Sequence, residues 1–137
     1  MRAVLDTNVL ISGVIATGVP HKLLIKGFER EYQIVVSVET LTEFRETLLK
    51  YPERFHMSEH EVQQEVELVR YYSEFVDPEE NIAAVEADPD DDKFLEAAVA
   101  GGVDYLVSGD GHLLEIDSFR GIDIVEPRTF YDLLDAS

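Results

Sequence analysis

The sequence contains no cysteine, which excludes disulfide bonds and metal sites built from thiolates. No apolar stretch approaches the roughly 20 residues that a membrane-spanning helix needs. The N-terminus has no basic region, and its apolar run is broken by Asp6, so we expect no signal peptide. Together these absences favour a cytoplasmic protein with no membrane segment.

Basic residues are also scarce. The chain has 11 Lys and Arg against 29 Asp and Glu, which gives a formal net charge of −18. Charge of this size opposes the approach of polyanions and destabilises the compact state at low ionic strength. A surface rich in acids suits molar salt, where the Debye length is about 3 Å. We therefore hypothesise a halophilic host; an ordinary acidic cytosolic protein is the alternative.

The order of apolar patterns predicts an α/β protein. With 137 residues, 45% of them hydrophobic, the chain is expected to form a single domain over residues 1–137. Short strands are expected at 3–5, 33–36, 75–76, 105–107 and 122–125. Helices are expected at 9–15, at 20–28, from 38 to near Tyr51 and Pro52, from 58 onward, at 88–101 and from 127 onward. Alternating strands and helices predict a three-layer α/β/α sandwich around a parallel sheet.

Four acidic residues occupy positions where such a fold exposes side chains. Asp6 follows the first strand, and Glu43 lies one to two turns into the helix after the second. Asp92 is in the first turn of the helix before the fourth strand, and Asp110 follows that strand. Open α/β sheets bind ligands at the carboxyl ends of their strands. If the first and fourth strands are neighbours, we expect these carboxylates to face one another.

Clustered carboxylates point to a hard divalent cation. Four of them in one cleft repel one another and raise each other's pKa values. Mg²⁺ or Mn²⁺ relieves this repulsion, because both ions prefer oxygen ligands. Such an ion activates water and stabilises charge on a phosphodiester. Asn8 and Ser108 are neutral polar groups placed to hold a carboxylate or a water. The pattern predicts metal-dependent phosphodiester hydrolysis.

Each acid also has a simpler interpretation. Asp6 could be only a helix cap, Glu43 a solvated helix residue, and Asp110 a turn former. The run from Asp88 to Asp92 could be a cap followed by a solvated charge run. The hypothesis therefore depends on the joint placement of the acids.

Rival motifs fit less well. The run from Asp88 places acids like a calcium loop, but Lys93 stands where that loop needs glycine and Val99 where it needs glutamate. A phosphoacceptor receiver domain fits the length and fold class, yet no lysine follows the last strand. A non-catalytic or receiver-like acidic domain that binds a basic partner remains the alternative function.

Four segments together resemble the PIN domain family, in the branch of toxin–antitoxin toxins similar to VapC. They are residues 4–12 (VLDTNVLIS), 41–44 (LTEF), 88–98 (DPDDDKFLEAA) and 106–110 (LVSGD). The resemblance implies strand order 3-2-1-4-5 and Mg²⁺- or Mn²⁺-dependent ribonuclease activity. It also implies a frequent homodimer and an antitoxin partner that covers the acidic cleft. The family's acidic quartet maps onto Asp6, Glu43, Asp92 and Asp110, with Asn8 and Ser108 in support.

Two details of the site stay open in the sequence. Asp90 and Asp91 crowd the third acidic position, so more than one acid there is a candidate metal ligand. RNA binding normally uses basic residues paired with phosphates. The basic residues near the motifs are Arg45 and Lys93, which are therefore the candidates for substrate binding.

Overall fold

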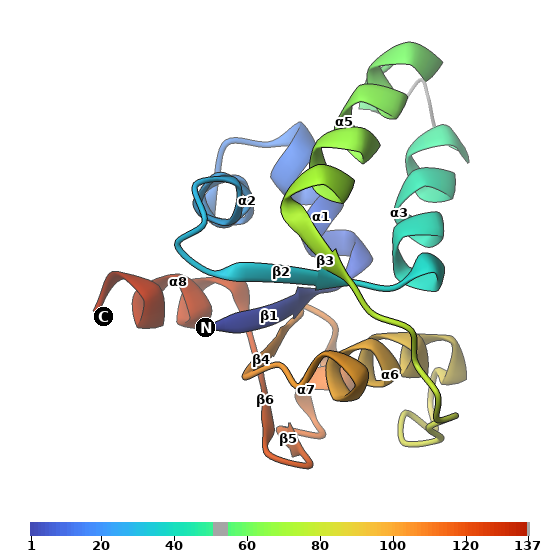
Figure 1. The fold of residues 1–137 in the computed structure, drawn as a ribbon, viewed down its shortest axis with the longest axis vertical. Helices are drawn as coiled ribbons and strands as arrows, with labels where there is room; N and C mark the ends of the chain where they lie inside the picture. The colour runs from blue at the N-terminus through green and yellow to red at the C-terminus, as the bar shows by residue number, and fades with distance from the viewer. Residues whose placement is uncertain (51–54, 137) are drawn as a thin grey trace.

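A six-stranded sheet forms the centre of the computed structural model, which describes residues 1–50 and 55–136 (Figure 1). The strands lie in the order β3-β2-β1-β4-β6-β5. They are β1 (Arg2–Leu5), β2 (Gln33–Val36), β3 (Ser73–Phe75), β4 (Tyr105–Val107), β5 (Ser118–Phe119) and β6 (Ile122–Val125). The first four and β6 are parallel and correspond to the five expected strands, so the predicted order 3-2-1-4-5 is confirmed. The short strand β5, antiparallel to β6, was not expected.

Helices cover both faces of the sheet, as expected for a three-layer sandwich. The helical segments are α1 (Thr7–Ile15), α2 (Val19–Phe28), α3 (Val38–Lys50), α5 (Glu59–Tyr72), the 3₁₀ turn η1 (Pro89–Asp91), α6 (Asp92–Gly101), α7 (Gly111–Leu114) and α8 (Pro127–Asp135). Figure 1 shows α1, α2, α3 and α5 on one side of the sheet and α6 and α7 on the other. Helix α8 packs into the core of the first side through Phe130 and Leu134. The predicted end of α3 near Tyr51 and Pro52 lies outside the described residues.

Alternating side chains of the strands feed two separate cores. In β1, Ala3 and Leu5 belong to the core under α1, α2, α3 and α5, whereas Val4 belongs to the core under α6. Successive residues of a strand point to opposite faces, so a strand buried on both faces must be apolar throughout. This explains the apolar runs of the central strands β1, β2 and β4.

Helix ends follow the local sequence. Ser58 and Glu61 form the expected capping box at the start of α5, with both reciprocal bonds present. Ser37 caps α3 by accepting a hydrogen bond from the backbone N–H of Thr40 at 3.1 Å. Gly102 ends α6 in the left-handed conformation, with φ of 55°, which glycine adopts without strain.

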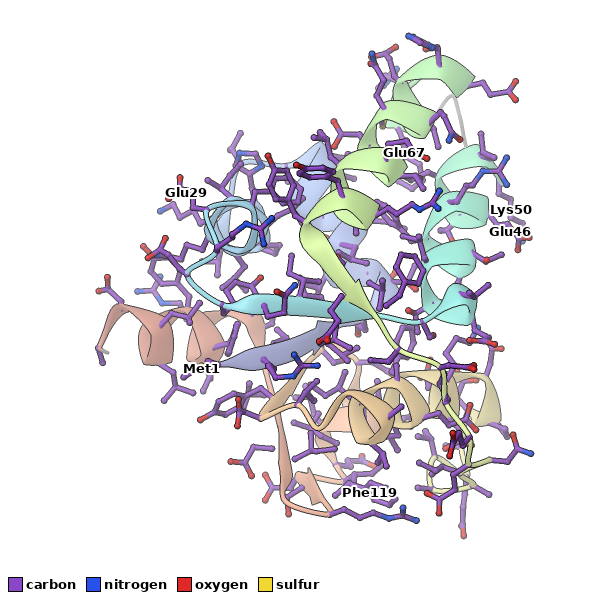
Figure 2. All side chains as sticks on the ribbon, in the orientation of Figure 1. Met1, Glu29, Glu46, Lys50, Glu67 and Phe119 are labelled. Atoms are coloured by element: carbon purple, nitrogen blue, oxygen red, sulfur yellow. The ribbon has the colours of Figure 1, made fainter. Side chains whose placement is uncertain are left out.

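The surface carries the excess negative charge. Figure 2 shows Glu29, Glu46 and Glu67 at the periphery of the molecule.

No single helix in residues 1–50 and 55–136 is long and apolar enough to span a membrane. Helices α1 and α2 meet the length and composition criteria only as a pair, and they are bent by 94° relative to each other.

Candidate functional site

An acid-lined pocket of about 210 Å³ lies where β1 and β4 end. These two strands pair directly, with Leu5 opposite Val107, so the residues that follow them come together as predicted. The backbone confirms the register, since the Asp6 N–H donates to the Val107 carbonyl at 3.0 Å. The residues lining the pocket are Asp6, Thr7, Asn8, Glu43, Thr47, Asp88, Asp91, Phe94 and Asp110.

Asp6 is buried at the base of this pocket and has two donors. One carboxylate oxygen accepts from the Val9 N–H at 2.9 Å, which makes Asp6 the N-cap of α1. The other accepts from the Ser108 hydroxyl. Burial raises the pKa of Asp6, and the bonds from Ser108 and Val9 only partly oppose that effect. Asp6 therefore caps α1 and also lines the pocket.

Ser108 connects the two strand-end acids. Its hydroxyl donates to Asp6 and accepts from the backbone N–H of Asp110 at 2.9 Å. Ser108 is fully buried, so this geometry is fixed by packing as well as by hydrogen bonds. Asn8 also lines the pocket. Both residues expected to support the acids thus lie beside them.

Glu43 reaches the pocket from α3 and is bound on both carboxylate oxygens. One oxygen accepts from the Thr7 hydroxyl at 2.6 Å, and the other pairs with the Lys93 ammonium. Lys93 also pairs with Asp90 at 3.2 Å. Burial acts to lower the pKa of Lys93, but its bonds to Glu43 and Asp90 outweigh that effect and raise it. Glu43 is therefore charge-compensated by the protein itself.

Asp91 carries the strongest electrostatic perturbation in the pocket. Its pKa is raised to about 8, first by burial and then by hydrogen bonding with the Asp110 carboxylate. The charges of Asp88, Asp110 and Asp6 raise it further. Burial and the neighbouring negative charges thus both favour the protonated form of Asp91.

The prediction that Asp92 faces the other acids is wrong in the structure. Asp92 does not line the pocket; Asp88 and Asp91 do. The Asp92 carboxylate is buried and accepts hydrogen bonds from the backbone N–H groups of Ala84 and Val85, each at 2.9 Å. The physical reason is the 3₁₀ turn η1, which ends at Asp91 and sets the direction of α6. Asp91 thereby takes the position predicted for Asp92.

Sequence reasoning did not place some of the residues that line the pocket. Asp91 was left open as a candidate, but Asp88 was not expected in the pocket; their spacing of three residues across the turn that begins with Pro89 was the available signal for placing both together. Thr7 follows Asp6 directly, but nothing in the sequence indicated its bond to Glu43. Arg45 is exposed and is not among the residues that line the pocket.

The pocket's donor set fits a hard divalent cation. Asp6, Asp91 and Asp110 supply carboxylate oxygens around one space, and burial together with the neighbouring acids raises the pKa of Asp91. Among the described residues, no three acidic or histidine side chains already converge at ligand distance from one point. Binding an ion would therefore require the carboxylates to draw closer together.

An acid-lined pocket at the carboxyl edge of a parallel sheet defines a class of α/β proteins that bind ligands at this edge. A PIN domain family model matches residues 2–112, and the chain belongs to this family. PIN domains are generally nucleases that depend on a divalent metal.

One solved structure supports the same fold. It is the crystal structure of VapBC2 from Rickettsia felis bound to a DNA fragment from the VapBC2 promoter. A chain of that structure is similar to this chain, with a TM-score of 0.61 and 13% sequence identity. The alignment covers 90% of this chain and 97% of the other. At this identity the likeness concerns the fold alone. No curated protein matches the chain significantly.

Proposed function

We propose that the protein is a Mg²⁺- or Mn²⁺-dependent endoribonuclease and the toxin of a toxin–antitoxin pair. The observation that carries the proposal is the convergence of Asp6, Asp91 and Asp110 on one pocket, where Asp91 has a pKa raised to about 8. Family membership supports nuclease chemistry, and the similar structure, which is named VapBC2, supports the toxin role. A cytoplasmic location follows from this role.

Different pocket residues would bind the cation and orient its ligands. Asp6, Asp91 and Asp110 would hold the cation, and Asp88 lies beside them in the pocket wall. The bound ion would supply activation of water and neutralisation of charge on the phosphodiester. Ser108 would orient Asp6 through its hydroxyl, as hydrogen-bond donors to metal-binding carboxylates do. Glu43 would assist from the edge, since Thr7 and Lys93 occupy its two oxygens.

Lys93 is the cation next to the pocket that is best placed to meet a phosphate. Its side chain is 19% exposed and is held by Glu43 and Asp90. An RNA phosphate could compete for this ammonium in the way that phosphates attract lysine generally. Arg45, exposed on the same helix as Glu43, would contribute at longer range. Both residues are proposed as substrate contacts.

The excess acid on the surface also suits a basic partner. An antitoxin segment carrying arginine would meet a complementary acidic pocket, and charge complementarity speeds and orients such association. Exposed Val38 and Phe75 provide apolar area at the ends of α3 and β3. We propose that the protein forms a homodimer. The rival function is a non-catalytic acidic domain that binds a basic partner through the same pocket.

A cleavage assay separates the two functions. Labelled single-stranded RNA would be incubated with the protein at several KCl concentrations, with Mg²⁺, with Mn²⁺ or with EDTA. We expect cleavage that requires the metal and stops with EDTA. Cleavage that survives EDTA would defeat the metal-dependent mechanism. No cleavage under any condition, together with binding of a basic peptide, would establish the rival.

A further inference from the structure

The segment between β3 and α6 carries two pocket acids yet has no regular secondary structure over residues 76–88. Figure 1 shows it crossing α6 and looping back before the chain enters that helix. Two of its side chains, Ile82 and Val85, are buried in the core beneath α6. Beyond Val76, which donates to the Val36 carbonyl of β2, the buried backbone groups of this segment need partners outside regular strands and helices.

Two carboxylates of α6 provide those partners. Asp92 accepts from the N–H groups of Ala84 and Val85, each at 2.9 Å. Glu96, one turn later, accepts from the N–H of Ile82 at 2.9 Å. Asp92 is only 7% exposed, and both of its bonds are made by the same oxygen. The first turn of α6 therefore fixes the backbone of the segment that precedes it.

Two consecutive turns connect the backbone at Val85 to the pocket. The Asp88 N–H donates to the Val85 carbonyl at 3.2 Å, and the Asp91 N–H donates to the Asp88 carbonyl at 3.0 Å. Val85 is thus bound by Asp92 through its N–H and by Asp88 through its carbonyl. Asp88 and Asp91 line the pocket. A shift of Val85 would be passed on directly to both acids.

We propose that Asp92 is a positioning residue: its buried carboxylate fixes the backbone at Ala84 and Val85 and so holds Asp88 and Asp91 in the pocket wall. This assigns Asp92 a role different from that of a metal ligand. The consequence for the cation rests on the proposed function, whereas the role in fixing the segment does not. One oxygen makes both bonds, so an amide oxygen can replace it.

Hydrogen exchange and Mn²⁺ binding test the proposal with four variants of the full chain. Asp92→Ala removes the acceptor, Asp92→Asn keeps an acceptor oxygen without the charge, and Asp91→Asn changes the pocket acid. Glu96→Ala removes the neighbouring acceptor and is the matched control. Exchange would be followed at the amides of residues 82–85 in EDTA, and Mn²⁺ affinity by titration in a separate experiment.

We expect Asp92→Ala to expose the amides of Ala84 and Val85 to hydrogen exchange. We also expect it to weaken Mn²⁺ binding by about tenfold, as the loss of a group that orients metal ligands does. Asp92→Asn restores both properties, while Asp91→Asn weakens Mn²⁺ binding without exposing the two amides. Glu96→Ala exposes Ile82 but not Ala84 or Val85. Val62→Ala, a core change on α5, controls for general destabilisation and leaves Mn²⁺ affinity unchanged.

Two results would overturn the proposal. One is that Asp92→Asn weakens Mn²⁺ binding as much as Asp91→Asn does, while the amides of Ala84 and Val85 stay protected from exchange in the Asp92→Asn variant. Asp92 would then be a ligand of the metal. If Asp92→Ala leaves exchange at Ala84 and Val85 unchanged, it does not fix the segment. Should Asp92→Ala fail to fold, the Asn variant still decides the first question. Absence of Mn²⁺ binding by the wild type would count against the proposed function only, because the exchange result stands by itself.

Discussion

Asp91 and Asp92 are neighbours in the chain, but their carboxylates serve different parts of the structure. Asp91 lines the acidic pocket together with Asp6 and Asp110, and the Asp92 carboxylate binds backbone N–H groups of the preceding segment. The division arises because Asp91 ends the 3₁₀ turn and Asp92 begins α6. Substitutions at these two positions should therefore have separable effects.

Asp91→Asn should stabilise the metal-free protein at high pH. The pKa of Asp91 is raised to about 8, above the roughly 4 of an unfolded aspartate, so the folded state keeps a proton that the unfolded state loses. The wild type is therefore destabilised progressively as the pH rises from about 4 to 8, and Asn removes this loss. Urea unfolding in EDTA at pH 5, 7 and 9 should show a stability gain that grows with pH. Asp90→Asn controls for the loss of one charge from the same turn, and equal gains from the two variants would contradict the account.

Ser108→Ala should destabilise the protein at neutral pH. The substitution removes the hydroxyl that donates to buried Asp6 and accepts from the Asp110 N–H. Leaving a buried polar group without its partner costs about 1–3 kcal/mol. Chemical denaturation would measure the loss. Ser12→Ala, a change on α1 outside the pocket lining, is the control; a Ser108→Ala loss no larger than this control would show that the hydroxyl does not support Asp6.

Glu43 and Lys93 should be coupled in a double-mutant cycle. Both side chains are partly buried, at 25% and 19% exposure, so their attraction is screened less than that of a surface pair. We expect a coupling of about 1 kcal/mol between Glu43→Gln and Lys93→Met. The exposed pair of Arg128 and Asp132 provides the reference cycle, with an expected coupling near zero. Similar couplings in the two cycles would indicate that Lys93 does not compensate Glu43.

The fold was largely predictable because its signals are local. A three-residue apolar run buried on both faces, as in β1, is visible in the sequence, and so is the capping box at Ser58. The short β5 was missed, since a two-residue strand is defined by its pairing with β6 and not by its own composition. Pairing of β1 with β4 was a condition of the site hypothesis, and the register confirms it.

The placement of acids around the pocket was predictable to within one residue. Asp6, Glu43 and Asp110 were placed correctly because their positions follow from strand ends and helix phase. For the third acid Asp92 was favoured and Asp90 and Asp91 were left open, because adjacent aspartates differ only in the direction that a 3₁₀ turn gives them. The use of Asp92 as a hydrogen-bond acceptor for residues 84 and 85 depends on how the irregular segment folds back. No periodicity in the sequence encodes such a contact.

Salt should stabilise the protein if the charge balance reflects a saline host. With a net charge of −18, repulsion among surface carboxylates opposes folding, and molar KCl screens it. The thermal unfolding midpoint should rise by several degrees between 0.1 M and 2 M KCl. A midpoint that does not change over this range would sink the halophile hypothesis.

The most direct test of the acidic pocket is a Mn²⁺ titration followed by electron paramagnetic resonance, which reports the free ion. We expect the wild type to bind Mn²⁺, and the variants Asp91→Asn and Asp110→Asn each to bind it at least about tenfold more weakly. Asp90→Asn, next to Asp91 but outside the pocket lining, should bind it like the wild type. Equal affinity of the wild type and Asp91→Asn, or no binding by the wild type, would contradict the account.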